Sequence, residues 1–193
     1  RGLGDVYKRQ AYSSSVINLS NHFTTSLGIT AQYFTLNKNW TVEPRAALKW
    51  TFNPKHALAL AYGLHSRRER LDYYFVEQEV NGKTESNRYL NFSKAHHFGL
   101  TYDWNINSYM HLKVEPYYQY LFRIPVEENS SFSIINHQSF YLERILKNRG
   151  SGVNYGIDIT LEQYMKNGFY YMITASLFKS RYKAGDHIWR NTR

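Results

Sequence analysis

The sequence contains no cysteine among its 193 residues, and this absence removes several classes of protein at once. Without thiols there is no disulfide framework and no thiolate metal site, which excludes disulfide-stabilised scaffolds and zinc ribbons. Proline and methionine are also scarce, with 4 and 3 residues. No apolar run reaches the roughly 18 residues of a transmembrane helix. Strands of about 9–11 alternating residues could still cross a membrane, because they leave a weaker hydropathy signal.

Aromatic residues are abundant instead, with 18 Tyr, 11 Phe and 4 Trp, and such side chains favour an all-β fold because they fit pleated, half-buried surfaces. The formal net charge of +9 ordinarily raises nucleic acid or an anionic membrane as a partner. The basic residues are scattered, however, and the one cluster, Arg67, Arg68 and Arg70, contains Glu69 and borders Asp72. A solvated loop explains this cluster better, so no nucleic-acid partner is predicted.

Apolar residues recur with a period of two from Thr24 onward, as a strand with two unlike faces requires. From Trp40 to Phe52 they hold the even positions, while the odd positions are mostly polar. The same alternation recurs at 27–33, 57–64, 96–106, 110–120, 153–162 and 169–177. The pattern predicts about seven strands of roughly 9–14 residues. Pro116 interrupts one of them, which indicates either a bulge or a different register.

The connections between these strands alternate in length. Turn-like tetrads lie at 53–56, 105–108 and 165–168, and long polar segments lie at 67–94, at 122–151 and after Tyr182. The long segments, together with the short 36–39 link, therefore lie at one edge of the sheet. A transmembrane barrel has this asymmetry, with short turns on the periplasmic side and longer loops outside. Since the strands are also about twice the 5–6 residues typical of soluble domains, a barrel is favoured.

Four longer stretches carry a family resemblance. They read VEPRAALKWTFNPKHALALAYGLHSR, NFSKAHHFGLTYDWNIN, LKVEPYYQYLFRIPVE and GSGVNYGIDITLEQYMKNGFYYMITASLFKSRY. In this order and spacing, over about residues 21–193, they resemble the barrel of TonB-dependent receptors, in the branch with an N-terminal carboxypeptidase-regulatory-like domain. The resemblance implies a barrel of about 22 strands with a plugged lumen, of which this chain supplies roughly a third. It also implies that the plug and the TonB-contacting motif lie outside this chain.

Two segments are expected. Residues 1–10 match neither the alternation nor the composition of the rest, and they are interpreted as a non-native leader. Residues 11–193 are predicted to form part of a TonB-dependent receptor β-barrel. The fold class is therefore all-β, an incomplete antiparallel transmembrane β-barrel with about seven long strands of a larger one.

No pattern in the sequence points to catalysis, a metal site or a cofactor. His96 and His97 are adjacent, and neighbours in a strand point to opposite faces, so they cannot chelate one ion together. The other histidines lack a spacing such as HExxH, and no Ser, His and acid arrangement is recognisable. Carboxylates such as Glu43, Asp103 and Glu115 are interpreted as partners of basic groups in the lumen. The chain is therefore not expected to be an enzyme.

Aromatic residues supply the candidate contact sites. Those at strand ends fit the interfacial girdles of membrane barrels, with ordinary core packing as the alternative; they are Trp40, Trp50, Trp104, Tyr109, Tyr170 and Tyr171. Aromatic residues in a long loop could contact a ligand at the extracellular mouth. These weak candidates for substrate binding are Tyr73, Tyr74, Phe75 and Tyr89.

The leading hypothesis is a receptor of the bacterial outer membrane that imports a scarce extracellular ligand by TonB-coupled active transport. Siderophores, cobalamin, glycans and peptides are all candidate ligands. Lipid would surround the barrel, and the TonB–ExbB–ExbD complex would act through N-terminal parts. Two alternatives are a passive porin-like or structural barrel and a soluble β-rich binding domain. The soluble alternative requires the apolar faces to point into a core rather than outward to lipid.

Overall fold

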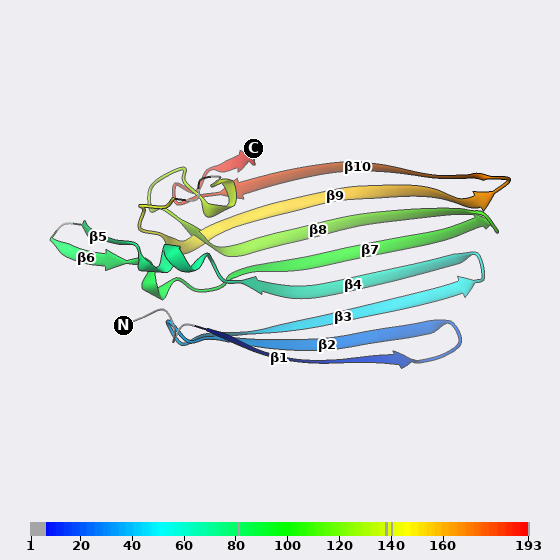
Figure 1. Ribbon diagram of the computed structural model, residues 1–193, viewed down its shortest axis with the longest axis horizontal. Helices are drawn as coiled ribbons and strands as arrows, with labels where there is room; N and C mark the ends of the chain where they lie inside the picture. Colours follow the sequence, from blue (N-terminus) through cyan, green and yellow to red (C-terminus); the bar gives the residue numbers. More distant parts are fainter. Residues whose placement is uncertain (1–6, 81, 138, 140, 193) are drawn as a thin grey trace.

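The computed structural model describes residues 7–80, 82–137, 139 and 141–192. Nine antiparallel strands in these residues form one open sheet, in the order β1-β2-β3-β4-β7-β8-β9-β10-β11 (Figure 1). The strands are β1 (Lys8–Asn18), β2 (Phe23–Phe34), β3 (Asn39–Asn53), β4 (His56–Arg67), β7 (Ser93–Asn107), β8 (Met110–Val126), β9 (Lys147–Lys166), β10 (Phe169–Lys183) and β11 (Trp189–Asn191). The predicted all-β antiparallel fold with long strands is confirmed, and the sheet does not close on itself.

All seven predicted strands are present, and β1 is an additional long strand of 11 residues. This strand was not predicted because serines occupy positions 13–15 and neither face of the strand is apolar, so the sequence shows no alternation there. Lys8–Gln10 lie within the segment interpreted as a leader, yet they pair with residues 32–34 of β2. The sheet thus extends into that segment. Residues 1–6 lie outside the described residues, and the non-native origin of the leader stays a prediction.

Short turns join β3 to β4, β7 to β8 and β9 to β10. In the first, Asn53 Oδ1 accepts hydrogen bonds from the N–H groups of Lys55 and His56, at 2.8 and 3.0 Å. In the second turn, Asn107 Oδ1 accepts hydrogen bonds from the N–H groups of Tyr109 and Met110 in the same way. This turn lies about two residues later than the predicted tetrad. Asparagine side chains of this kind replace the backbone acceptors that a tight turn needs. The three turns lie at one edge of the sheet, opposite the long loops (Figure 1).

The third turn depends on two residues with left-handed backbone. Asn167 has φ 53° and Gly168 has φ 83°, the signs required by the commonest two-residue hairpin turn. We expect Gly168→Ala to lower the free energy of unfolding by about 1 kcal/mol, because alanine is strained at this φ. Gly99→Ala is the matched control, since an added Cβ meets no atom within 4 Å at either glycine. Equal urea unfolding midpoints for the two variants would contradict this explanation.

Pro116 sits in β8 without a bulge and without a register change. It pairs directly with Ile157 of β9. On the other side, the β7 pairing passes from Gly99 opposite Tyr117 to Tyr102 opposite Val114 in unchanged register. The missing N–H of proline therefore interrupts the ladder locally. The two expected alternatives, a bulge at Pro116 or a different register, were therefore both wrong.

The two faces of the sheet are opposite in character to those of a soluble domain. Apolar side chains in mid-strand are exposed; they include Leu27 (48%), Ile29 (51%), Leu48 (42%), Leu60 (57%), Ile173 (59%) and Leu177 (72%). Polar residues on the other face are buried; they include Thr30, Gln32, Thr41 and Glu43. A soluble sandwich would bury the first set and expose the second. No helix in the described residues is long and apolar enough to cross a membrane.

The hydrophobic core of the molecule lies in the loops, not between sheet layers. Its main cluster consists of Phe34, Tyr73, Tyr74, Leu90, Phe92, Leu142 and Leu146, all at the long-loop edge of the sheet. The loop between β4 and β7 contains η2 (Leu71–Phe75), β5 (Glu77–Val80), β6 (Lys83–Ser86) and η3 (Asn87–Tyr89). The loop between β8 and β9 contains η4 (Ile134–Asn136). The described residues within 68–92 and 127–146 are called the loop cap below.

Candidate functional site

Two asparagines, the buried Asn87 in the loop cap and Asn148 at the start of β9, connect the segments of the loop cap and its border. Asn87 is fully buried; its Nδ2 donates to the carbonyl of Arg144 at 2.8 Å, and its Oδ1 accepts from the N–H of Leu146 at 2.7 Å. Asn148 likewise accepts from the N–H of Asn91 and donates to its carbonyl. Each amide satisfies one donor and one acceptor that secondary structure leaves unpaired. The two loops therefore form one packed unit at the edge of the sheet (Figure 1).

The four aromatic candidates divide into two pairs. Tyr73 and Tyr74 are 5% and 1% exposed, and the Tyr74 ring packs edge-on against Phe34 at 5.1 Å. Burial also raises the pKa of Tyr74 to about 12. Both side chains thus pack mainly inside the loop cap, although Tyr73 still lines a hollow at its surface, so ligand contact stays a prediction for them. Phe75 and Tyr89 are 45% and 75% exposed, so ligand contact stays a prediction for them.

The structure does not bring Phe75 and Tyr89 into one site. Phe75 lines a hollow of about 610 Å³ between η2, the start of β5 and residues 141–143. Tyr89 lines a separate hollow of about 500 Å³ with residues 145–149. Two distinct surfaces of the loop cap thus carry one exposed aromatic candidate each.

Glu69 is an ionisable group buried inside the loop cap. It is 3% exposed, and one carboxylate oxygen accepts a hydrogen bond from Ser93 Oγ at 2.5 Å. Burial raises the pKa of Glu69, while the Ser93 bond and the charge of Arg67 lower it by less. Because the folded cap holds this proton more tightly than the unfolded chain does, the resulting stability is complete below pH 4.5 and is lost as pH rises through the raised pKa.

We expect Glu69→Gln to remove this part of the pH dependence. Glutamine keeps an acceptor for Ser93 and carries no charge to bury, so the cap should resist limited proteolysis better than the wild type at neutral pH. Below pH 4.5 the two proteins should be cleaved at similar rates. Glu85→Gln, at a side chain 38% exposed, is the control and should change little. Parallel pH profiles for wild type and Glu69→Gln would rule out this role.

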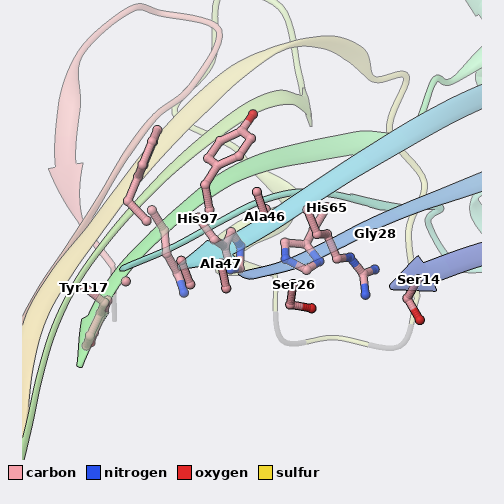
Figure 2. Close-up of a pocket in the computed structure, with 15 residues that line it drawn as sticks. Ser14, Ser26, Gly28, Ala46, Ala47, His65, His97 and Tyr117 are labelled. Carbon is pink, nitrogen blue, oxygen red and sulfur yellow. The ribbon is translucent and has the colours of Figure 1, made fainter. Parts of the chain in front are cut away.

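The polar face of the sheet is hollowed next to the loop cap. A depression of about 530 Å³ is lined by several small residues and by Arg45, His65, His97 and Gln119, among others. Figure 2 shows the His65 and His97 side chains next to each other, with Ser14 and Ser26 on the same side of the sheet. The ring centroids of the two histidines are 4.4 Å apart.

This histidine pair was missed in the sequence because it depends on cross-strand register. Gly63, two residues before His65, lies directly opposite His97. His96 points to the other face, where Tyr62 lies at hydrogen-bond distance, 3.0 Å from the oxygen to Nδ1. The prediction that the adjacent histidines face opposite sides is therefore confirmed. No group of three or more His, Cys, Asp or Glu side chains in the described part of the chain could hold a metal ion.

Aromatic rings form a row on the apolar face near the short turns. Their sequence across the strands is Phe23, Trp50, Phe52, His56 and Trp104, with neighbouring centroids 4.8–5.8 Å apart. Trp50 and Trp104, predicted as girdle residues, belong to this row. Trp40 and Tyr170 are 71% and 74% exposed. Contact of these rings with lipid stays a prediction.

Three solved structures are similar to this chain over 92% of its length. They are the FrpB iron transporter of Neisseria meningitidis as apoprotein (TM-score 0.65, 13% identity), the ferric-catecholate import receptor Fiu of E. coli K12 (0.69, 10%) and the RagAB peptide importer in a closed-closed state (0.66, 13%). The fold is that of part of a TonB-dependent receptor barrel. No protein-family model and no curated protein matches the chain.

The similarity has a defined extent. The chain covers 26%, 28% and 22% of the three structures, so it spans about a quarter of their length. At 10–13% identity the similarity establishes the fold and not the activity. The similar proteins are transporters and import receptors by description, and none is described as an enzyme.

Proposed function

We propose that this chain is part of an outer-membrane receptor that imports a scarce extracellular ligand by TonB-coupled active transport. The observation that carries the proposal is the reversed polarity of the sheet, with apolar side chains exposed in mid-strand on one face and polar side chains buried near the long loops on the other. Lipid is the environment in which such a face is stable, because the strands satisfy their backbone groups within the sheet. The fold of a TonB-dependent receptor barrel supports the same assignment.

The proposal includes the partners and the orientation. The loop cap would face outward, and the turns at Asn53, Asn107 and Asn167 would face the periplasm. TonB–ExbB–ExbD would act through parts of the protein outside this chain. A passive porin-like barrel is the second candidate, and it differs in needing no energy coupling. The similarity to import receptors favours energy-coupled import over a passive barrel.

Thiol labelling tests the orientation, because this chain contains no cysteine of its own. Tyr89→Cys in the full-length protein should react with a membrane-impermeant maleimide on intact cells, since Tyr89 is 75% exposed in the loop cap. Lys55→Cys, at an exposed position of the β3–β4 turn at the opposite edge, should react only after the outer membrane is permeabilised. Labelling of both positions on intact cells, or of neither, would overturn the proposed topology.

Energy coupling is tested separately from topology. Cells that depend on the full-length receptor for growth on a scarce nutrient should lose that growth when TonB is deleted. Growth that persists without TonB would favour the passive barrel.

Alanine at Phe75 or Tyr89 should weaken uptake if either exposed aromatic contacts the ligand, whereas unchanged uptake in both variants would remove them as ligand-binding residues.

A further inference from the structure

We propose that Arg45, His65 and His97 form a binding site for an anionic group, a carboxylate or phosphate carried by a small molecule. The site lies on the polar face of the sheet, between the loop cap and mid-strand. This inference rests on the proposed import function and deepens it, because it names the chemical class of the ligand.

A glycine lets the three basic side chains converge. Arg45 of β3 and His97 of β7 both pair directly with Gly63 of β4, which leaves an open space between them. The His65 ring lies over that space, so a Cβ on Gly63 would be 2.7 Å from His65 Nε2 and 3.6 Å from Arg45 Cγ. Three strands thus bring three nitrogen-bearing side chains together around one glycine.

The cluster joins two hollows. His65 and His97 line both the depression of about 530 Å³ and a second hollow of about 580 Å³ under the loop cap. The second hollow is also lined by Arg67, Lys94 and His137. His137 Nε2 is buried and has no hydrogen-bond partner among the described residues. The two hollows adjoin each other, because they share His65 and His97.

The carboxylates beside these hollows already have partners. Glu43 accepts hydrogen bonds from the Gln32 amide and, at 3.1 Å, from the N–H of Ser66, and its second oxygen lies 3.3 Å from Arg45. Glu69 accepts from Ser93 Oγ. Arg45, Arg67 and Lys94 exceed Glu43 and Glu69 by one positive charge, and an excess of positive charge in a hollow attracts anions.

The Arg45 guanidinium suits an oxyanion in particular. Its side chain is 48% exposed, and Glu43 fixes one end of the fork while other N–H groups stay accessible. A planar guanidinium with several donors matches carboxylate and phosphate geometry, and the imidazoles can add a donor each. A metal ion fits less well, because Arg45 would repel a cation and structural metal sites usually need more ligands than two histidines.

Titration calorimetry of the full-length protein in detergent, with citrate and inorganic phosphate as probes, tests the site. Arg45→Gln and His65→Gln should each weaken binding of the better probe by roughly tenfold, the effect of losing one charge-assisted hydrogen bond. Lys49→Gln is the matched control, since it removes one positive charge from the same strand and the same face, four residues away. We expect the control to change affinity less than about twofold.

The alternatives give different results. Equal losses for Arg45→Gln and Lys49→Gln would mean that only the overall charge attracts the probes, which would overturn the site. Binding of Zn²⁺ that His65→Gln abolishes, with no binding of either anion, would show a metal site instead. A lower melting temperature of Arg45→Gln without any added anion, again with no anion binding, would show that a carboxylate of the protein fills the position. TonB-dependent growth that is intact in the Arg45→Gln variant would leave the import function standing while removing its anionic ligand.

Discussion

Glu43→Ala is expected to lower the free energy of unfolding by roughly 3 kcal/mol, because it leaves the buried Gln32 amide and the half-buried Ser66 N–H without an acceptor. The side chain of Glu43 is 3% exposed. The β3–β4 ladder ends where Arg45 pairs with Gly63, and beyond that point the Glu43 carboxylate accepts the N–H of Ser66 in place of a backbone carbonyl. The carboxylate thus continues the connection between two strands after their ladder ends.

Urea unfolding of the full-length protein in detergent, followed by circular dichroism, measures this effect. Glu43→Gln should cost less than Glu43→Ala, since the amide keeps one acceptor oxygen. Glu115→Ala is the control, because Glu115 pairs with Lys113 at 2.8 Å on the same face but is 36% exposed. An exposed ion pair contributes about 0–1 kcal/mol, so the control should differ little from the wild type. Similar losses for Glu43→Ala and Glu115→Ala would refute the role of Glu43.

Leu60→Arg is expected to destabilise the protein in a bilayer by about 2–4 kcal/mol, the cost of an arginine at the lipid-facing midplane of a barrel. Leu60 is 57% exposed near the middle of β4, on the apolar face. The neighbouring Ala59→Arg is the control, because Ala59 points to the polar face, where it pairs with Lys49 and Thr101. If Leu60 faces lipid and Ala59 faces the lumen, arginine should destabilise the protein much more at position 60 than at position 59.

The measurement is the unfolding free energy in lipid vesicles, compared with the yield of folded protein in the outer membrane. We expect Leu60→Arg to reduce both, and Ala59→Arg to reduce neither by a comparable amount. In a soluble β-domain the result would be reversed or absent, since an exposed arginine has no desolvation cost in water. Improved solubility and unchanged stability of Leu60→Arg would therefore contradict the membrane assignment.

The sequence alone determined the fold class and the position of most strands. A strand with one lipid face and one polar face must alternate, and the alternation from Trp40 to Phe52 reproduces the two faces that the structure shows. Asn53 and Asn167 identified the edge of the sheet that carries the short turns. Few residue types can accept the free N–H groups of a tight turn, as Asn53 does, or adopt a positive φ, as Asn167 does. β1 was missed since its serine-rich stretch carries no such contrast.

Only the tertiary structure decided which loop aromatics are available to a ligand and which basic residues meet. Tyr74 and Phe75 are adjacent in sequence, yet the first is buried against Phe34 and the second is exposed, a difference set by packing between distant segments. His65 and His97 converge because β4 and β7 pair in one register, after a long intervening loop. Local patterning fixes the period and the turns, whereas contacts between strands depend on a register that no single strand encodes.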